Sequence, residues 1–314
     1  MGWISPFKLN RLGMLNMNRR NVDYISRYNN RASYPLVDNK LRTKLVVEEY
    51  DVPTPKLLQV VRQQHEISRF KTRADGLNCF AVKPAKGSGG KGITVITGRE
   101  GDHFLKASGA AVPLSYLERH LSNILAGLYS LGGSPDVAIV EDLVESIPGL
   151  ARYSFQGVPD IRIVVFQGYP VMAMLRLATK ASDGKANLHQ GAIGVGLNIA
   201  NGHGLNAVQF NRPVTHHPDM GLALENIVIE DWDKMLAMAA RCYEATGLGY
   251  MGVDLVVDAK HGPLLLELNA RPGLAIQMAN GCGLLPRLQS IEALRRPHFT
   301  PDERVKFVKD AFGA

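Results

Sequence analysis

The segment between residues 252 and 273 constrains the fold more than any other stretch of the sequence. It reads GVDLVVDAKHGPLLLELNARPG, two runs rich in branched aliphatic residues on either side of a polar turn at Lys260-His261. This pattern predicts two antiparallel strands joined as a hairpin. Asp254 and Glu267 lie equally far from the centre of that turn, so the hairpin would place them directly opposite one another.

Facing carboxylates among aliphatic residues repel one another, and removal from water makes the repulsion worse. A divalent cation between Asp254 and Glu267 would remove that cost. Asn269, two residues beyond Glu267, shares its face of the strand. Three oxygen donors that leave room for water and phosphate suit Mg²⁺. The pattern therefore predicts a metal site, with Arg271 as a neighbouring cation; the alternative is a surface hairpin with solvated acids.

A glycine-rich loop joins two further strand-like runs, at 80–85 and 92–97. It matches the G-x-G-x-x-G pattern of dinucleotide-binding folds, but those folds continue into a helix, whereas β-branched residues follow here. It is not a P-loop, because glycine stands where serine or threonine would follow the lysine. The loop indicates a hairpin tip at which Gly89, Gly90 and Lys91 can reach phosphates, or else an ordinary flexible turn.

Two strand-like runs in the middle of the chain carry arginines. The run DIRIVVFQ has Asp160 and Arg162 on one face, and the following run YPVMAMLRLA carries Arg176. A polar loop beyond them contains Asn187. The guanidinium groups can hold an anion through paired hydrogen bonds. The alternative is an ion pair with Asp160 at the surface of the sheet.

The distribution of charge separates the N-terminal segment from the rest of the chain. Residues 1–44 contain nine Lys or Arg and two Asp, whereas residues 45–314 contain 27 basic and 27 acidic residues. The net charge of +7 therefore belongs to the first 44 residues. The balanced remainder argues against a broad nucleic-acid-binding face. The basic segment itself is either a solvated arm or a specific anion site.

Strand-like runs occur in adjacent pairs, interrupted by single helical patterns, which predicts an α+β fold with antiparallel sheets. The first 35 residues predict irregular structure with one short helix. Helical patterns are expected over 40–52, 56–69, 114–131 and 231–245. No run of apolar residues is long enough for a membrane helix, and no secretory signal is recognisable. Three separated cysteines indicate reduced thiols and a cytoplasmic location.

Taken together, these residues resemble the ATP-grasp superfamily of carboxylate–amine ligases, most closely its RimK-like group of alpha-L-glutamate ligase-related proteins. The resemblance covers about residues 38–290 and rests on the order and spacing of short pieces. The pieces are DNKL at 38–41, AVKP at 81–84, the glycine-rich loop, VEDLVE at 140–145, DIR at 160–162, NLH at 187–189, Asp254 and ELNARPG at 267–273.

The resemblance implies an ATP-grasp fold in which two α+β subdomains clamp ATP, without the full domain that precedes the core of RimK-type ligases. Lys40 and Lys83 would contact the phosphates. Glu141 and the backbone of Leu143 would hold the edge of the adenine, and Glu145 would bind the ribose hydroxyls. The loop residues complete the implied nucleotide-binding set: Gly89, Gly90 and Lys91.

The resemblance also implies that the three oxygen donors of the hairpin hold Mg²⁺, or Mn²⁺ in its place. These are Asp254, Glu267 and Asn269. A further set would face the γ-phosphate and the acyl intermediate: Arg162, Arg176, Asn187 and Arg271. The implied activity is an ADP-forming ligase that makes an amide bond through an acyl phosphate, adding glutamate or another amino acid.

The expected organisation has four regions. They are a basic segment over 1–38, a small subdomain with a lid hairpin over 39–140, a large subdomain with the metal-binding hairpin over 141–300, and a C-terminal helix or tail over 301–314. The expected partners are a carboxylate and an amine, either small molecules or peptides. An acidic acceptor could bind the basic segment, and a homo-oligomer is compatible with the sequence. The alternatives are an ATP-grasp kinase of small molecules, or a nucleotide-binding module tethered by its basic arm.

Overall fold

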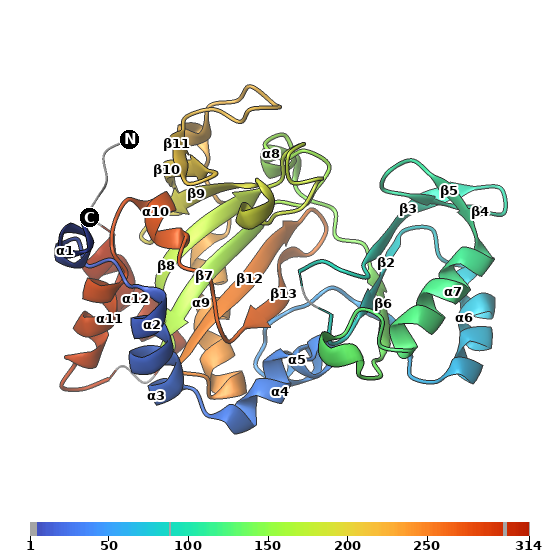
Figure 1. The fold of residues 1–314 in the computed structure, drawn as a ribbon, viewed down its shortest axis with the longest axis horizontal. Coiled ribbons are helices and arrows are strands. Elements are labelled where there is room, and N and C mark those ends of the chain that lie inside the picture. Colours follow the sequence, from blue (N-terminus) through green and yellow to red (C-terminus); the bar gives the residue numbers. More distant parts are fainter. Residues whose placement is uncertain (1–4, 88, 298–299, 314) are drawn as a thin grey trace. The chain divides into compact units, whose positions relative to one another are not determined.

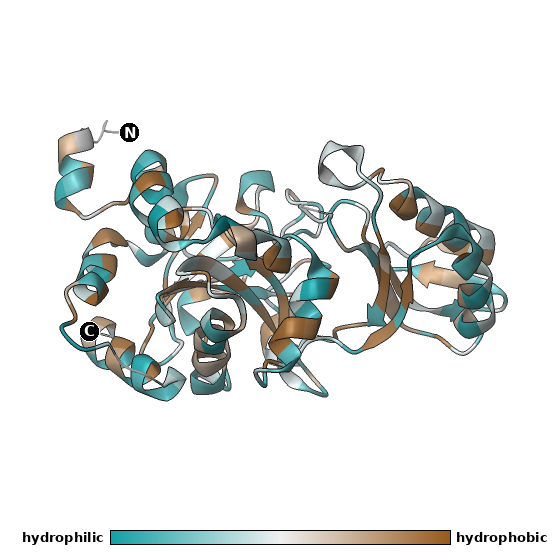
Figure 2. Ribbon diagram, turned by 90° about the horizontal axis from the view of Figure 1, so that it is seen from below, coloured by the Kyte–Doolittle hydropathy of each residue, from teal (hydrophilic) through white to brown (hydrophobic). Residues whose placement is uncertain are grey.

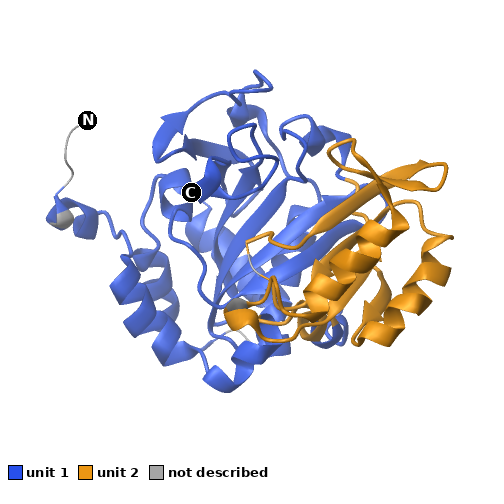
Figure 3. Cartoon of the chain, turned by 45° about the vertical axis from the view of Figure 1, so that its right-hand side comes forward, with its two compact units in different colours: residues 1–37, 45–53, 146–314 blue, residues 38–44, 54–145 orange. Residues whose placement is uncertain are grey.

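The computed structural model describes residues 5–297, apart from residue 88, and residues 300–313. The chain divides into two compact units, which Figure 3 distinguishes by colour. Unit 1 contains residues 1–37, 45–53 and 146–314, and unit 2 contains residues 38–44 and 54–145. The division falls within helix α5 (Lys40–Glu48), which the sequence predicted over this region.

Unit 2 is built on a six-stranded antiparallel sheet with strand order β1-β6-β2-β3-β4-β5 (Figure 1). Its elements are β1 (Leu57–Val61), α6 (Ile67–Ala74), β2 (Phe80–Pro84), β3 (Thr94–Glu100), β4 (His103–Lys106), β5 (Ala111–Pro113), α7 (Leu114–Leu125) and β6 (Ala138–Asp142). Burial alternates along β2, so one face of that strand packs inward. The core there is aromatic, with the Phe80 ring edge-on to both Phe70 and Phe104.

Unit 1 contains a seven-stranded antiparallel sheet with strand order β11-β10-β9-β8-β7-β12-β13. The strands are β7 (Asp160–Phe166), β8 (Tyr169–Leu177), β9 (Ile193–Leu197), β10 (Gly204–Gln209), β11 (Arg212–Val214), β12 (Tyr250–Asp258) and β13 (Gly262–Asn269). Every residue of β7, β8 and β12 is buried. Apolar residues accordingly gather in the strands of this sheet (Figure 2). The predicted α+β fold with antiparallel sheets is confirmed.

The α-helices in the C-terminal part of unit 1 are four to fifteen residues long. They are α8 (Pro148–Ala151), α9 (Trp232–Thr246), α10 (Ile276–Asn280), α11 (Leu285–Glu292) and α12 (Pro301–Phe312). The helix α12 begins with a capping box, in which Thr300 and Glu303 each accept a hydrogen bond from the other's backbone N–H. Among the described residues, no helix has both the length and the apolar composition needed to cross a bilayer.

The N-terminal segment folds as a succession of helical turns. These are α1 (Pro6–Arg11), α2 (Met17–Arg19), the π-helical turn η1 (Arg20–Ile25), α3 (Ser26–Tyr28), the 3₁₀ turn η2 (Arg31–Ser33) and α4 (Tyr34–Val37). Hydrogen bonds to residues far along the chain hold it to the rest of unit 1. The backbone N–H of Leu15 donates to Gln277 Oε1 at 2.7 Å, Arg20 Nη1 donates to the carbonyl of Pro272 at 2.7 Å, and Asn29 Nδ2 donates to the carbonyl of Tyr250 at 2.7 Å. Most of this basic segment is therefore part of a folded unit.

Two expectations for secondary structure are wrong. Residues 56–69 were expected to form one helix, but residues 57–61 form β1 and pair with β6. The run Leu-Leu-Gln-Val-Val suits a strand because its β-branched residues pack on a pleated surface. The N-terminal segment, expected to contain one short helix, contains several; α1 and α2 begin at side-chain caps, where Ser5 accepts from the backbone N–H of Lys8 and Asn16 from that of Arg19.

Candidate functional site

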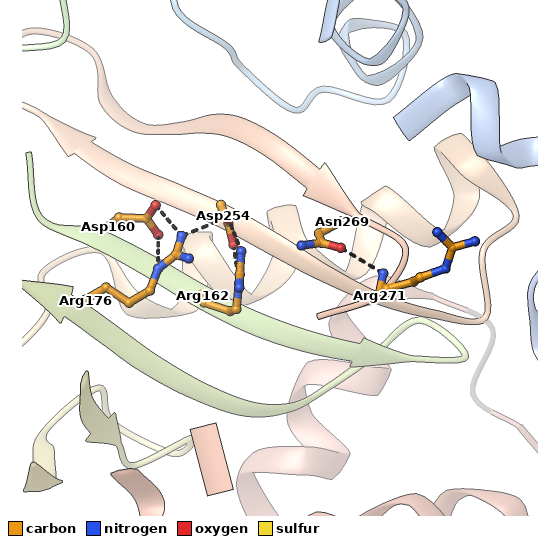
Figure 4. Close-up of polar contacts among 6 residues, drawn as sticks. All are labelled: Asp160, Arg162, Arg176, Asp254, Asn269 and Arg271. Atoms are coloured by element: carbon orange, nitrogen blue, oxygen red, sulfur yellow. Dashed lines mark hydrogen bonds and ion pairs between the residues drawn. The ribbon is translucent and has the colours of Figure 1, made fainter. Parts of the chain in front are cut away.

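Four charged side chains meet on the sheet of unit 1 (Figure 4). Strand pairing places Arg162 opposite Asp254 and Arg176 opposite Asp160. Arg162 donates from Nε to Asp254 Oδ1 at 2.7 Å and from Nη2 to Oδ2 at 2.5 Å. Arg176 donates from Nη2 to Asp254 Oδ2 at 2.8 Å and from Nε to Asp160 Oδ1 at 3.2 Å. We call these four residues the arginine–aspartate cluster.

The arginine–aspartate cluster is buried and balanced in charge. Asp254 is 0% exposed, and the other three members are each at most 9% exposed. Burial by itself would raise the pKa of Asp254, but Arg162 and Arg176 outweigh it and lower that pKa to about 2. Burial raises the pKa of Asp160 to about 6, although Arg176 acts in the opposite direction. The two guanidinium groups are thus fixed in place by carboxylates on neighbouring strands.

The predicted hairpin is present, with the register that the sequence indicated. Asp254 pairs with Glu267 and Gly252 pairs with Asn269 across β12 and β13. A bulge follows Asp254 in this ladder. Asn269 Oδ1 accepts a hydrogen bond from the backbone N–H of Arg271 at 2.8 Å, which fixes the turn after β13.

The three predicted magnesium ligands of the hairpin have different surroundings. Both oxygens of Asp254 accept hydrogen bonds from guanidinium groups, and a dication beside them would be repelled by two buried positive charges. Glu267 and Asn269 are half-buried and carry oxygen donors of the kind magnesium prefers. In the part of the chain that the structure describes, no group of three or more His, Cys, Asp or Glu could hold a metal ion. The predicted metal role of Asp254 thus stays a prediction, and its observed partners are arginines.

A second buried charged group lies in unit 2. Glu141, on β6, is 2% exposed and forms ion pairs with Lys83 on β2 and with Lys44 on α5, the latter at 3.0 Å. Lys44 Nζ also donates to Thr54 Oγ1 at 2.9 Å. Lys83 and Glu141 were predicted from the sequence, but Lys44 was not. Lys44 lies four residues after Lys40 on the same helix, so the two side chains share a helix face, and this spacing could have indicated a role for Lys44.

The glycine-rich loop of unit 2 is held at both ends. Lys40 Nζ donates to the carbonyl of Gly87 at 2.6 Å, and a ring nitrogen of His120 lies 2.9 Å from the carbonyl of Gly92. Between these ends, Gly89 and Gly90 have positive φ angles of 62° and 74°. A Cβ added at either position would meet no described atom within 4 Å. The loop therefore has anchored ends and an open tip, on which Lys91 is exposed.

Sequence reasoning missed His120, which anchors the second end of this loop. A carbonyl oxygen only accepts, so Nε2 of His120 carries the proton and donates to Gly92. Its Nδ1 lies 3.4 Å from the hydroxyl of Tyr129, and its ring stacks on Tyr116 at an interplanar angle of 7°. Burial lowers the pKa of His120 below 6.5, which favours this neutral form. No local motif marks the residue, because its partner lies 28 positions away.

The remaining predicted residues have simpler surroundings. Asn187 caps a short turn, accepting a hydrogen bond from the backbone N–H of His189 at 3.0 Å. The exposed guanidinium of Arg271 lies 5.3 Å from the centre of the Tyr34 ring. Leu143 is half-buried and Glu145 exposed, both beyond the end of β6 in unit 2. The predicted residues thus form separate groups within each unit.

Two antiparallel α+β units, one with a glycine-rich hairpin tip and one with charged side chains on its sheet, are features of the ATP-grasp class. Residues 19–293 match the model of a family described as sugar-transfer associated ATP-grasp. The chain therefore belongs to the sugar-transfer associated ATP-grasp family. The predicted membership of the ATP-grasp superfamily, and with it the ATP-grasp fold, is confirmed.

The chain is also similar to curated proteins described as probable alpha-L-glutamate ligases, as predicted. One from Thioalkalivibrio sulfidiphilus is 31% identical over 146 residues, which cover 46% of this chain and 37% of that protein. Another, from Stenotrophomonas maltophilia strain R551-3, is 44% identical over 62 residues, covering 19% of this chain and 21% of that protein. The matched segments thus span well under half of these relatives.

Among solved structures, the chain is similar to D-alanyl-alanine synthetase A from Vibrio cholerae, with 12% identity and a TM-score of 0.48. That similarity covers 89% of this chain and 66% of the synthetase. A D-cycloserine synthetase, DcsG, gives 16% identity and a TM-score of 0.47 over 82% of this chain and 70% of its own.

Proposed function

We propose that this protein is an ATP-dependent, ADP-forming ligase that joins a carboxylate to an amine. The observation that carries the proposal is the pair of buried guanidinium groups, Arg162 and Arg176, fixed by carboxylates on the sheet of an ATP-grasp protein. Fixed guanidinium groups suit chemistry in which negative charge builds up on a transferred phosphoryl group.

The nucleotide in this proposal is ATP, which reaches proteins as its magnesium complex. The open tip of the glycine-rich loop would lie over the phosphates, with Lys91 as a neighbouring cation. Lys40 and Lys83 would add positive charge, and Glu141 neutralises Lys83 until the nucleotide binds. The backbone of Leu143 would contact the adenine. Glu145, which is exposed, would bind the ribose hydroxyls.

The proposed reaction has two steps. First, a carboxylate oxygen attacks the γ-phosphorus of ATP, the bond from that phosphorus to the β-phosphate oxygen breaks, and ADP leaves. The product is an acyl phosphate. Second, the nitrogen of an amine attacks the acyl carbon, the carbon–oxygen bond to phosphate breaks, and the amine loses a proton. The products are an amide, ADP and inorganic phosphate. Arg162, Arg176 and Arg271 supply the cations that stabilise phosphoryl oxygens.

Glutamate is the amine that we propose to test first, because two similar curated proteins are described as probable alpha-L-glutamate ligases. The carboxylate partner is proposed only as a class, a small molecule or a peptide that carries a free carboxyl group.

Trapping with hydroxylamine tests the proposal without knowledge of the amine. The protein is incubated with ATP, magnesium, pooled carboxylates and hydroxylamine, and hydroxamates and ADP are measured by mass spectrometry. A hydroxamate that requires both protein and ATP supports an acyl phosphate. ADP together with a phosphorylated metabolite, and without hydroxamate, would indicate a kinase and contradict the proposal.

Conservative variants make this test specific to the arginines. We expect Arg162→Lys and Arg176→Lys each to reduce hydroxamate formation at least about 100-fold, because lysine keeps the charge but loses the paired hydrogen bonds. The matched control is Arg212→Lys, at an exposed arginine of β11, which should retain full activity. Equal activity in all three variants would show that the arginine–aspartate cluster takes no part in the reaction.

A further inference from the structure

The first part of the N-terminal segment has no role in the proposed ligase site. The family match begins at residue 19, so α1 and the start of α2 precede it. Leu15 is buried and held by hydrogen bonds to Gln277, whereas the side chains described between residues 5 and 12 are all exposed. In Figure 3, α1 lies at the end of unit 1, away from its sheet. A helix of six residues with every described side chain exposed gains little stability in water.

Large apolar side chains are concentrated in this segment. Of the fourteen that are exposed among the described residues, five lie between residues 7 and 22. They are Phe7 (81% exposed), Leu9 (37%), Leu12 (54%), Met17 (64%) and Val22 (66%). Single exposed apolar residues are ordinary, but a concentration of five within sixteen residues makes this segment a candidate binding surface.

The same segment is basic, since residues 5–22 contain four Lys or Arg and no Asp or Glu. Exposed Lys8 and Arg11 lie between Phe7 and Leu12 on α1. Arg19 forms an ion pair with Asp23 and Arg20 is buried, so Lys8 and Arg11 are the exposed basic residues of the segment. Basic and apolar side chains alternate around this short helix, so it offers no single apolar stripe for a groove of fixed shape. The surface of an anionic membrane can take both kinds of side chain, because lipid phosphates attract Lys and Arg while apolar side chains insert at the level of the headgroups.

We propose that the segment over residues 5–22 binds the surface of a membrane that contains anionic lipid. Phe7 and Leu12 would insert at the level of the headgroups, and Lys8 and Arg11 would contact lipid phosphates. Each basic residue near such a surface contributes about 1 kcal/mol, an attraction that salt screens. Full burial of a Phe or Leu side chain contributes roughly 1.5–3 kcal/mol. The interaction is peripheral and leaves the two folded units in water.

Sedimentation with lipid vesicles tests this proposal on the full chain. Vesicles of phosphatidylcholine are compared with vesicles in which part of that lipid is replaced by phosphatidylglycerol, at low and high salt. We expect the protein to sediment with the anionic vesicles and not with the neutral ones, and salt to reduce the bound fraction. Absence of sedimentation with anionic vesicles at low salt would overturn the proposal.

Paired variants identify the surface that binds. We expect Phe7→Ser with Leu12→Ser, and separately Lys8→Glu with Arg11→Glu, to weaken vesicle binding about tenfold or more. The matched controls are Leu128→Ser with Val228→Ser, and Arg69→Glu with Lys71→Glu, at exposed positions elsewhere. These controls should bind like the parent protein. Equal loss in the control variants would mean that binding is nonspecific, which contradicts the proposal.

Two further readouts separate this proposal from its alternatives. Single-stranded RNA is added as a soluble polyanion, and tighter binding to RNA than to anionic vesicles would overturn the membrane assignment. ADP formation is measured for every variant in solution, where we expect no change. A loss of turnover without a loss of vesicle binding would concern the ligase site alone.

Discussion

At the scale of single residues, the decisive finding is that Asp254 lies between two arginines. The sequence placed it opposite Glu267, and the strand register agrees. Its side-chain partners, however, come from β7, where Arg162 is directly opposite, and from β8, which carries Arg176. A sequence pattern within one hairpin cannot reveal this contact, because residues 162 and 254 are 92 positions apart. The carboxylate therefore serves first to neutralise buried guanidinium groups.

Removal of this carboxylate tests its structural role. We expect Asp254→Asn to lower the free energy of unfolding by about 3–5 kcal/mol, because Asp160 alone would then face two buried guanidinium groups. Urea denaturation without any added metal measures the effect, since a residue that only binds metal would contribute little there. The control is Asp183→Asn, which breaks an exposed ion pair with Lys185 and should cost at most about 1 kcal/mol. Equal stability of the two variants would contradict this role.

Because buried His120 is neutral, we expect the free energy of unfolding to depend on pH. Burial lowers its folded pKa below the ordinary value of 6.5, so the unfolded chain binds the proton more readily. The stability that results is complete above pH 6.5 and is lost as the pH falls through the folded pKa. The groups that face the ring are Tyr116, Tyr129, the carbonyl of Gly92 and, further off, Lys106.

We therefore expect His120→Gln, which keeps a donor for Gly92 but does not titrate, to show a shallower decline in unfolding free energy between neutral and acidic pH. Urea titrations at several pH values measure the slope. His65→Gln, at an exposed histidine of unit 2, should leave the slope unchanged. A His120→Gln slope identical to that of the parent chain would show that His120 is not the titrating group.

At the scale of elements, the alternation of apolar and polar residues and the positions of turn residues predicted most of the strands. The sequence did not predict the contacts between elements. The pairing of β12 with β13 follows from one polar turn between two aliphatic runs. Residues 57–61 were misassigned because a short run of Leu, Gln and Val satisfies helical spacing as well as strand alternation. Lys83 and Glu141 were expected at the site, but the contribution of Lys44 appears only when α5 is placed beside the sheet of unit 2.

Two substitutions in the glycine-rich loop test whether its anchored end matters for ATP binding. A Cβ at Gly92 would lie 2.4 Å from the Tyr129 ring, whereas a Cβ at Gly89 meets no described atom within 4 Å; both residues have positive φ. We expect Gly92→Ala to weaken ATP binding about tenfold more than Gly89→Ala, because it displaces the end of the loop. Calorimetric titration with a nonhydrolysable ATP analogue measures both. Equal effects would mean that strain at φ, rather than the contact with Tyr129, governs the loop.

At the scale of the whole molecule, the basic N-terminal segment has two parts with different roles. The side chains described between residues 5 and 12 are exposed, whereas Leu15, Tyr24 and Ile25 belong to the hydrophobic core of unit 1. The sequence located the charge correctly but could not show this division, because the partners of the segment lie more than 200 residues further along the chain.

Two truncations test the division. We expect deletion of residues 1–12 to shift the melting temperature by less than about 2 °C, since only exposed side chains are lost among the described residues. Deletion of residues 1–35 removes buried Leu15, Tyr24 and Ile25 and should prevent cooperative unfolding. Differential scanning calorimetry measures both, and a stable, cooperatively unfolding protein without residues 1–35 would contradict the assignment of this segment to the core.

The discontinuity of unit 1 has a consequence for synthesis on the ribosome. Unit 2 ends at residue 145, so all of it is available before most of the unit 1 sheet has been made. Leu15 meets Gln277 only after 262 further residues, which takes roughly 13–52 s at ordinary rates of translation. For that time Leu15 lacks this partner, and the dense positive charge of the nascent N-terminal segment opposes its association with other chains.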